Sequence, residues 1–437
     1  MEIFVKIVQF VLSLSILIVA HEFGHFFFAK LFKTRVEKFY LFFDPWFSLF
    51  KYKKGDTEYG VGWIPLGGYV KISGMIDESM DKEQMSQPPQ PWEFRSKSVW
   101  QRFWIMFAGV FVNFLLALFL YVVILFNWGE SYLPANELKY GIAADSLALY
   151  AGLQDGDQIL SIDNVTVERF NAIATTLLLE EAKTIQILRN GNRQEIELPA
   201  DFVARLIQAK GFISPRIPFQ IEEVVKDSPA EKAGLKPGDR IIGVDGIPAL
   251  FSHEVLRAFA RLKGQAAQLS VVRGTDTLSL AATLTPEGQI GVIRDVKSFF
   301  TYKTVEYGIL ESIPAGIERG ISTASNYLKQ FKLFFQPKTK AYESLGGFIT
   351  IGSIFPAEWN WEAFWSMTAF LSIILAIMNI LPIPALDGGH LMFLFFEIIT
   401  GRKPSDKVME YAQITGMIIL FALLIFANGN DVLKLFR

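Results

Sequence analysis

A nearly unbroken apolar run from Ile3 to Ala29 constrains this chain most, because it is long enough to cross a bilayer as one helix. Three ionisable side chains lie inside it, in the sequence His21-Glu22-Phe-Gly-His25. Burying such groups in hydrocarbon is costly, so they indicate a functional site within the membrane. Residues four apart share a helix face, which directs both imidazoles to one metal ion, and Glu22 is a residue type that takes a proton from an attacking water. The alternative, two core histidines beside an unrelated glutamate, leaves this spacing unexplained.

The composition narrows the class of protein and the kind of metal site. Of the 437 residues, 51% are hydrophobic and 14% aromatic, which indicates a membrane protein with appended soluble parts. A net charge of −2 offers no electrostatic basis for binding nucleic acid, and we expect no such partner. Cysteine is absent, so any metal must be held by His, Asp or Glu.

Hydropathy and charge predict the membrane topology. Four segments are predicted to cross the membrane: 1–30, 103–127, 361–390 and 407–428. Lys and Arg are concentrated in the short segments that follow the first and third spans, so both should face the cytoplasm. Both termini and the long region 128–360 should then lie outside. This topology brings His25 and Asp387 to similar depths, near the cytoplasmic ends of their spans.

The outer region contains an internal repeat. Residues 148–164 match residues 230–246, and each copy has a Gly-Leu-x-x-Gly-Asp turn followed by a predicted strand. A later strand in each copy ends near Arg189 or Arg273. The pattern resembles the circularly permuted PDZ domain of bacteria, which implies two domains, 128–215 and 216–298, that bind peptide C-termini by strand addition. The alternative is that they serve as spacers or size filters without a peptide ligand.

The segments that flank these domains have simpler interpretations. Residues 299–360 are predicted to form amphipathic connecting helices that pack on a neighbouring domain or on the membrane surface. Residues 77–91, rich in Met, Gln and Pro, are predicted to form a loop.

The best candidate for a third metal ligand is Asp387. A catalytic zinc site has three protein ligands and an open position for water, and the first span supplies only two. The remaining histidines, His253 and His390, are weaker candidates than a carboxylate at the inner end of a span. Pro382 and Pro384, just before Asp387, should open the helix and admit water. The alternative is that Asp387 only caps the following helix.

Two motifs together resemble a known family. His21-Glu22-x-x-His25 and Asn379-x-x-Pro-x-Pro-x-Leu-Asp387-Gly are similar to the two signatures of the site-2 protease family of intramembrane zinc metalloproteases. The tandem PDZ insertion narrows the resemblance to the bacterial members that regulate sigma E. Residues 62–74 resemble the membrane re-entrant β-hairpin of that group. The implied fold is a polytopic α-helical membrane protein with four transmembrane helices, a membrane-associated β-hairpin and two inserted permuted PDZ domains.

The resemblance implies a role for each matching residue. His21, His25 and Asp387 would bind Zn²⁺. Glu22 would be the general base that later protonates the leaving amine, and Asn379 would hydrogen-bond the substrate backbone. A substrate unwound from its helix would pair as a β-strand with the hairpin segment Gly67, Gly68, Tyr69 and Val70. The hairpin has a second interpretation, compatible with the first, as an interfacial anchor that uses Trp63 and Tyr69.

The predicted function is therefore an intramembrane zinc metalloendopeptidase of the bacterial inner membrane. The family implies that it cleaves transmembrane segments of pre-trimmed membrane proteins, namely an anti-sigma factor and remnant signal peptides, and releases a cytoplasmic regulator in an envelope stress response. The PDZ domains would be periplasmic and the active site near the cytoplasmic side. One alternative is a non-catalytic PDZ membrane receptor or scaffold. A metal transporter is another, although inverted repeats and ligands at the bilayer midplane are typical of transporters, and the repeat here is in the soluble region.

Overall fold

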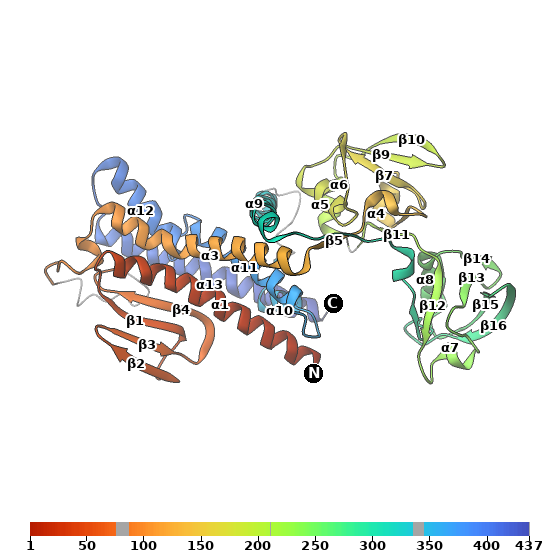
Figure 1. Cartoon of the computed structure of the whole chain (residues 1–437), viewed down its shortest axis with the longest axis horizontal. Helices are drawn as coiled ribbons and strands as arrows, with labels where there is room; N and C mark the ends of the chain where they lie inside the picture. The colour runs from red at the N-terminus through yellow and green to blue at the C-terminus, as the bar shows by residue number, and fades with distance from the viewer. Residues whose placement is uncertain (76–86, 210, 335–344, 437) are drawn as a thin grey trace. The chain divides into compact units, whose positions relative to one another are not determined.

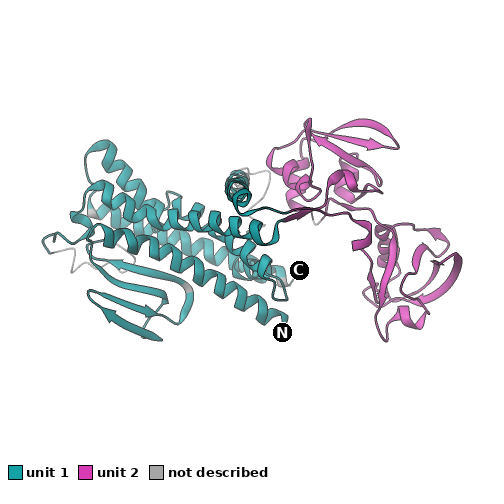
Figure 2. Ribbon diagram, viewed as in Figure 1, with its two compact units in different colours: residues 1–129, 306–336, 341–437 teal, residues 130–305, 337–340 magenta. Residues whose placement is uncertain are grey.

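The chain divides into two structural units (Figures 1 and 2). The computed structural model describes residues 1–75, 87–209, 211–334 and 345–436. The membrane unit comprises residues 1–129, 306–336 and 341–437, and the β unit comprises residues 130–305 and 337–340. Most of the predicted loop over residues 77–91, from 77 to 86, lies outside the described residues.

Four helices of the described chain are long and apolar enough to cross a membrane. They are α1 (Glu2–Leu31), α3 (Val99–Trp128), α11 (Trp361–Ile380) and α13 (Asp406–Leu435). A capping box of Ser98 and Gln101 starts α3 a few residues before its predicted boundary. Helices α1 and α11 both pack along α3, and the buried face of α1 repeats every four residues: Gln9, Ser13, Leu17, His21 and His25. The interior face of α1 is thus the face that carries the two histidines.

The predicted third span of 361–390 is wrong as a single segment. Helix α11 ends at Ile380, residues 381–386 form a loop, and α12 runs from Asp387 to Thr400. Pro382 and Pro384 explain the break, because proline has no backbone N–H to donate and clashes with the preceding turn. Asp387 is the first residue of α12, and the N-cap position belongs to Leu386. Capping therefore does not account for Asp387.

Helices α9 and α10 are also among the described elements of the membrane unit. Helix α9 (Ile309–Phe334) is one amphipathic helix with Pro314 inside it, and it packs on α3 and α11. Gly316 permits this packing, since a Cβ there would lie 2.6 Å from Val122. Helix α10 (Phe348–Ser353) is fixed by Asp431 of α13, whose carboxylate accepts hydrogen bonds from the backbone N–H groups of Gly347 and Thr350.

A four-stranded sheet lies against α1 in the membrane unit (Figure 1). Its strands are β1 (Val36–Phe43), β2 (Phe50–Lys54), β3 (Thr57–Val61) and β4 (Ile64–Ile72), in the order β2-β3-β1-β4. The prediction of a hairpin over residues 62–74 is wrong, because this segment contains one strand, β4. Strand β4 pairs with β1, which inserts between β3 and β4, and among the described strands the other edge of β4 has no partner.

The β unit contains two similar assemblies, each with its own core. The first has the sheet β10-β9-β7-β8 and the second the sheet β16-β15-β13-β12-β17, with β14 on β13. Their strands are β7 (Gln158–Ile162), β8 (Val165–Thr166), β9 (Thr184–Arg189), β10 (Asn192–Glu197), β12 (Phe219–Val224), β13 (Arg240–Val244), β14 (Ile247–Pro248), β15 (Ala266–Arg273), β16 (Asp276–Thr283) and β17 (Val292–Arg294). The helices are α4 (Ser146–Tyr150), α5 (Ala172–Leu179) and α6 (Phe202–Gln208) in the first, and α7 (Pro229–Lys232) and α8 (Ser252–Arg261) in the second. Within the described residues, two short strand pairs join β5 (Glu130–Tyr132) with β18 (Lys303–Val305) and β6 (Ile142–Ala144) with β11 (Ile213–Pro215).

The sequence repeat corresponds to a repeated ion pair. Arg189 donates to both carboxylate oxygens of Asp157, at 2.8 and 2.7 Å, and to the carbonyl of Gly152. Arg273 makes the same contacts with Asp239 and the carbonyl of Gly234, each at 2.7 Å. Burial opposes ionisation of Asp239, but the hydrogen bonds from Arg273 and from the backbone of Lys236 hold its pKa below the usual value. Each pair ties the Gly-Asp turn to the end of a strand.

Candidate metal centre

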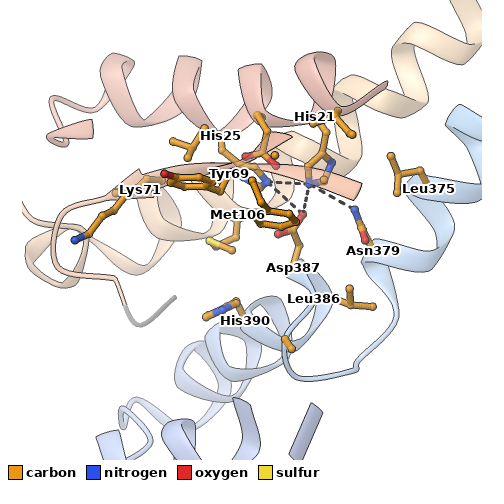
Figure 3. A pocket seen from close by; sticks show the side chains of 18 of the residues that line it. His21, His25, Tyr69, Lys71, Met106, Leu375, Asn379, Leu386, Asp387 and His390 are labelled. Carbon is orange, nitrogen blue, oxygen red and sulfur yellow. Dashed lines mark hydrogen bonds and ion pairs between the residues drawn. The ribbon is translucent and has the colours of Figure 1, made fainter. Parts of the chain in front are cut away.

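His21, His25 and Asp387 converge at one point between α1 and the start of α12 (Figure 3). The Oδ2 atom of Asp387 lies 3.2 Å from Nε2 of His21 and 3.3 Å from Nε2 of His25, and the two Nε2 atoms are 3.2 Å apart. All three side chains are at most 14% exposed. Among the described residues, this Oδ2 atom has no hydrogen-bond partner of proper geometry, although it is buried. Two imidazoles and one carboxylate around such an atom fit a catalytic zinc ion with one open position.

Helix α3 orients the two imidazoles. The Nδ1 atom of His25 lies 2.8 Å from the carbonyl of Ile105, so it can donate its proton there and leave Nε2 for a metal. Gly109 makes room for both rings, because a Cβ there would lie 2.3 Å from Nε2 of His25. No motif in the sequence indicated this role for Gly109.

Asn113 of α3 is the second functional candidate without a predicted role. Its amide nitrogen is 3.4 Å from Nδ1 of His21, and its Oδ1 atom is buried without a hydrogen bond within the described chain. The available signal was that Asn113 is a strongly polar residue in the middle of an apolar span. Polarity alone did not indicate which of the other spans it would face.

The nine predicted site residues line one cavity of about 610 Å³. It is bordered by α1, the end of α11, the start of α12 and the edge strand β4, and the set is His21, Glu22, His25, Gly67, Gly68, Tyr69, Val70, Asn379 and Asp387. The amide nitrogen of Asn379 lies 3.4 Å from Nε2 of His21 (Figure 3). The structure brings these residues together, while their individual roles stay predictions.

Strand β4 packs closely on the face of α1 that carries Ile18 and Glu22. A Cβ at Gly68 would lie 2.6 Å from Ile18 and 3.6 Å from Cγ of Glu22, so a larger residue would push the strand away. The Tyr69 hydroxyl donates to Oδ1 of Asp44 at 2.8 Å. Burial and this hydrogen bond raise the pKa of Tyr69, which keeps its phenol neutral. Tyr69 thus supports the strand, and its hydroxyl is committed to Asp44.

The two remaining histidines lie in different places. His390 is three residues after Asp387 on α12 and lines the same cavity (Figure 3). His253 belongs to α8 of the β unit, where its Nε2 atom lies 3.1 Å from Oδ2 of Asp155. Neither belongs to the cluster of His21, His25 and Asp387.

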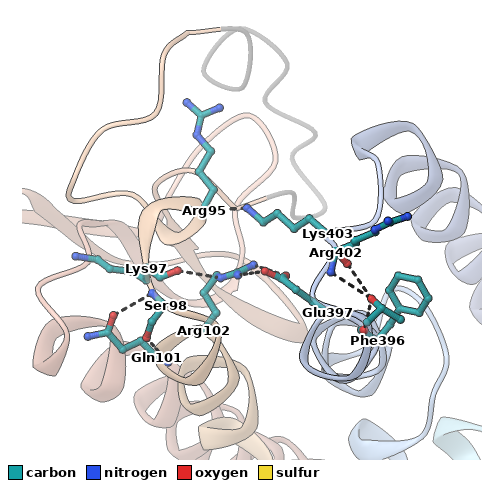
Figure 4. Close-up of polar contacts among 10 residues, drawn as sticks. Arg95, Lys97, Ser98, Gln101, Arg102, Phe396, Glu397, Arg402 and Lys403 are labelled. Atoms are coloured by element: carbon teal, nitrogen blue, oxygen red, sulfur yellow. Dashed lines mark hydrogen bonds and ion pairs between the residues drawn. The ribbon is translucent and has the colours of Figure 1, made fainter.

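A buried ion pair fixes the far end of α12. Arg102 of α3 makes a bidentate contact with Glu397 of α12, at 2.6 and 3.0 Å, and these side chains are 8% and 18% exposed (Figure 4). Arg102 also donates to the carbonyl of Lys97, and Lys403 donates to the carbonyl of Arg95. The helix that begins with Asp387 is therefore tied to the helix that carries Gly109 and Asn113.

Comparison with known proteins identifies the family. The model of Peptidase family M50 matches residues 9–423 of this chain. The chain belongs to peptidase family M50. Among similar proteins, the regulator of sigma E protease of Haemophilus influenzae is 32% identical and the regulator of sigma-E protease RseP of Escherichia coli K12 is 31% identical, each over 98% of both chains. A Vibrio cholerae protein named as a candidate zinc metalloprotease is 29% identical, also over 98% of both chains.

The family confirms the predicted class of enzyme and its metal. This M50 protein is a zinc metalloprotease, as the resemblance to site-2 proteases implied. It is also a polytopic membrane protein with β domains.

Proposed function

We propose that this M50 protease is an intramembrane endopeptidase that cleaves transmembrane segments of membrane proteins already trimmed outside the membrane. His21, His25 and Asp387 hold the zinc ion, and Glu22 is the general base. The observation that carries the proposal is a single cavity, lined by helices apolar enough to span a membrane, which contains a metal-binding cluster, a carboxylate and an open strand edge.

The side chains of the cavity divide the chemical work. Zinc, when bound, supplies Lewis acidity that makes a water a stronger nucleophile and stabilises negative charge on the scissile carbonyl oxygen. Glu22 takes the proton of the attacking water and transfers it to the leaving amine. Ile105 keeps His25 in the tautomer whose Nε2 lone pair is available. Asn113 holds His21 in the corresponding tautomer once its amide is rotated by half a turn. This rotation places Oδ1 of Asn113, in place of the amide nitrogen, beside Nδ1 of His21.

Substrate binding requires that a transmembrane helix be opened, because a helical peptide bond is hydrogen-bonded and shielded. The outer edge of β4 offers replacement backbone partners at Gly67–Val70, next to Glu22. Asn379 has an amide that can hold the substrate backbone on the opposite wall of the cavity. Exposed aromatic rings, such as Trp63 at 37% exposure, suit the same sheet to an interfacial position.

We extend the proposal to topology and substrates. The lysine and arginine bias supports a bacterial inner-membrane protein with four spans, a periplasmic β unit and an active site near the cytoplasmic face. The two assemblies of the β unit fit tandem permuted PDZ domains that bind peptide ends or exclude untrimmed substrates by size. Relatives that regulate sigma E support an anti-sigma factor as substrate, with remnant signal peptides as a second class and release of a cytoplasmic regulator as the outcome.

The test is cleavage of a single-span membrane substrate by the purified protein in liposomes. Glu22→Gln should reduce kcat by about 100- to 10,000-fold, because the general base is lost. It should retain zinc, since Glu22 is outside the cluster of metal-binding atoms. Metal analysis of both proteins provides the control. Unchanged cleavage by Glu22→Gln would refute the proposed mechanism, because it would show that Glu22 is not the general base.

A further inference from the structure

The loop between α11 and α12 has a strained backbone close to the metal centre. This loop, residues 381–386, links the helix of Asn379 to Asp387. Within it Ala385 has a φ of +82°, in a region that residues other than glycine rarely adopt. Such a conformation persists only where surrounding contacts impose it, and it often occurs at functional sites.

A side chain of the fourth span provides one such contact. The backbone N–H of Ala385 donates to Oε1 of Gln413, on α13, at 3.1 Å. Gln413 is 6% exposed, so this hydrogen bond is made in a buried environment where losing the acceptor is costly. Ala385 is two residues before Asp387, and a change at its amide therefore alters the direction in which the carboxylate is presented.

Close packing on both sides of the loop provides the second contact. Gly416, three residues after Gln413, lies so close to the loop that a Cβ would be 1.6 Å from the carbonyl oxygen of Pro384. On the other side, a Cβ at Gly389 would be 2.6 Å from Cα of Pro384. Gly429 of the same helix has nothing within 4 Å of such a Cβ. The close approach is thus local to the part of α13 that faces the loop.

We propose that Gln413, supported by Gly416, is a positioning residue of the catalytic centre. It holds Ala385 in its left-handed conformation and so places Asp387 and Asn379 against His21 and His25. Gln413 lines the same cavity but lies outside the cluster of metal-binding atoms, and it acts through the loop backbone. The inference rests on the proposed function, because it assumes that Asp387 binds zinc.

The experiment compares full-length variants for zinc affinity, measured by competition with a chelator, and for kcat and KM on a single-span substrate in liposomes. Gln413→Leu should weaken zinc binding and lower kcat by about tenfold each, as loss of a supporting contact does at other metal sites. KM should stay within about twofold. Adding Ala385→Gly should restore most of both losses, because glycine adopts this φ without strain.

Two glycine variants complete the design. Gly416→Ala should lower both zinc affinity and kcat, as Gln413→Leu does. If the Gln413→Leu protein does not accumulate, Gly416→Ala provides the test in its place. Gly429→Ala, in the same helix, should match the wild type.

Three results would overturn the inference. The first is that Gln413→Leu keeps the zinc affinity and kcat of the wild type. The second is that only KM rises in Gln413→Leu, which would make Gln413 a substrate contact. The third is that adding Ala385→Gly to Gln413→Leu restores neither zinc affinity nor kcat. Wild-type protein that binds no zinc would instead refute the proposed function itself.

Discussion

Two carboxylates with little exposure, Asp239 in the β unit and Asp387 in the membrane unit, have opposite surroundings. In the β unit, both oxygens of Asp239 accept hydrogen bonds from Arg273, and Asp157 and Arg189 repeat the arrangement. In the membrane unit, Asp387 directs an oxygen without a hydrogen bond toward two imidazole nitrogens. A carboxylate whose partners are complete stabilises a fold, whereas one with an unfilled position among other metal-binding atoms indicates a ligand. The difference indicates a structural role for Asp239 and a metal-binding role for Asp387.

Asp387→Asn should have the largest effect, since it removes the negative charge from the metal-binding cluster. We expect zinc affinity to fall by more than about 100-fold and cleavage to be lost with it. Zinc content and cleavage are measured on the same preparation. Unchanged zinc content would remove Asp387 from the set of ligands and erase the contrast with Asp239.

Arg102→Leu should destabilise the membrane unit by about 3–5 kcal/mol, because it leaves Glu397 buried without its partner. Loss of cleavage should accompany this, since the pair holds α12 against α3. Unfolding in detergent, followed by tryptophan fluorescence, measures the stability. The matched control is Arg35→Leu, which removes an exposed 4.0 Å contact with Asp56 and should change little.

Asp239→Asn and Asp157→Asn should each destabilise only their own assembly, by about 2 kcal/mol, because hydrogen bonds between charged groups are weakened. Hydrogen exchange should show faster exchange in β13 and β15 for the first variant and in β7 and β9 for the second. Zinc binding should be unaffected in both. Loss of zinc from either variant would contradict the division of roles between the units.

Acid should produce the smallest effect, which is the loss of the Asp239 ion pair below about pH 4. The pKa of Asp239 is lower in the folded protein than its unfolded value of about 3.9, so its ion pair contributes full stability above that value. This contribution is lost as the pH falls below about 4, through the folded pKa. Hydrogen exchange of β13, corrected for intrinsic rates, should therefore be constant between pH 7 and 5 and rise below pH 4. In Asp239→Asn the increase in exchange below pH 4 should be smaller, because this variant has no carboxylate at position 239 to protonate.

Local sequence patterns predict much of this molecule. The apolar runs predict the four long helices, since the length of a span is set by the bilayer. The spacing of His21 and His25 places them on one face, and the prolines at 382 and 384 predict a break before Asp387. The repeated Gly-Asp turn predicts two similar assemblies. Each of these features depends on residues near one another in the chain, where helical period, turn geometry and hydrophobicity act directly.

Contacts between distant segments were decided only by the tertiary structure. β1 inserts between β3 and β4, so the open edge of β4 faces the cavity although the sequence suggested a simple hairpin. Gly109, Asn113 and Gln413 gain their roles from neighbours on other helices. Hydrophobicity places such helices in a membrane but does not specify how they pack, because lipid tails are as apolar as the helix side chains. Their rotation and register follow from close packing and from satisfying each buried polar group, and those conditions exist only once the helices are together.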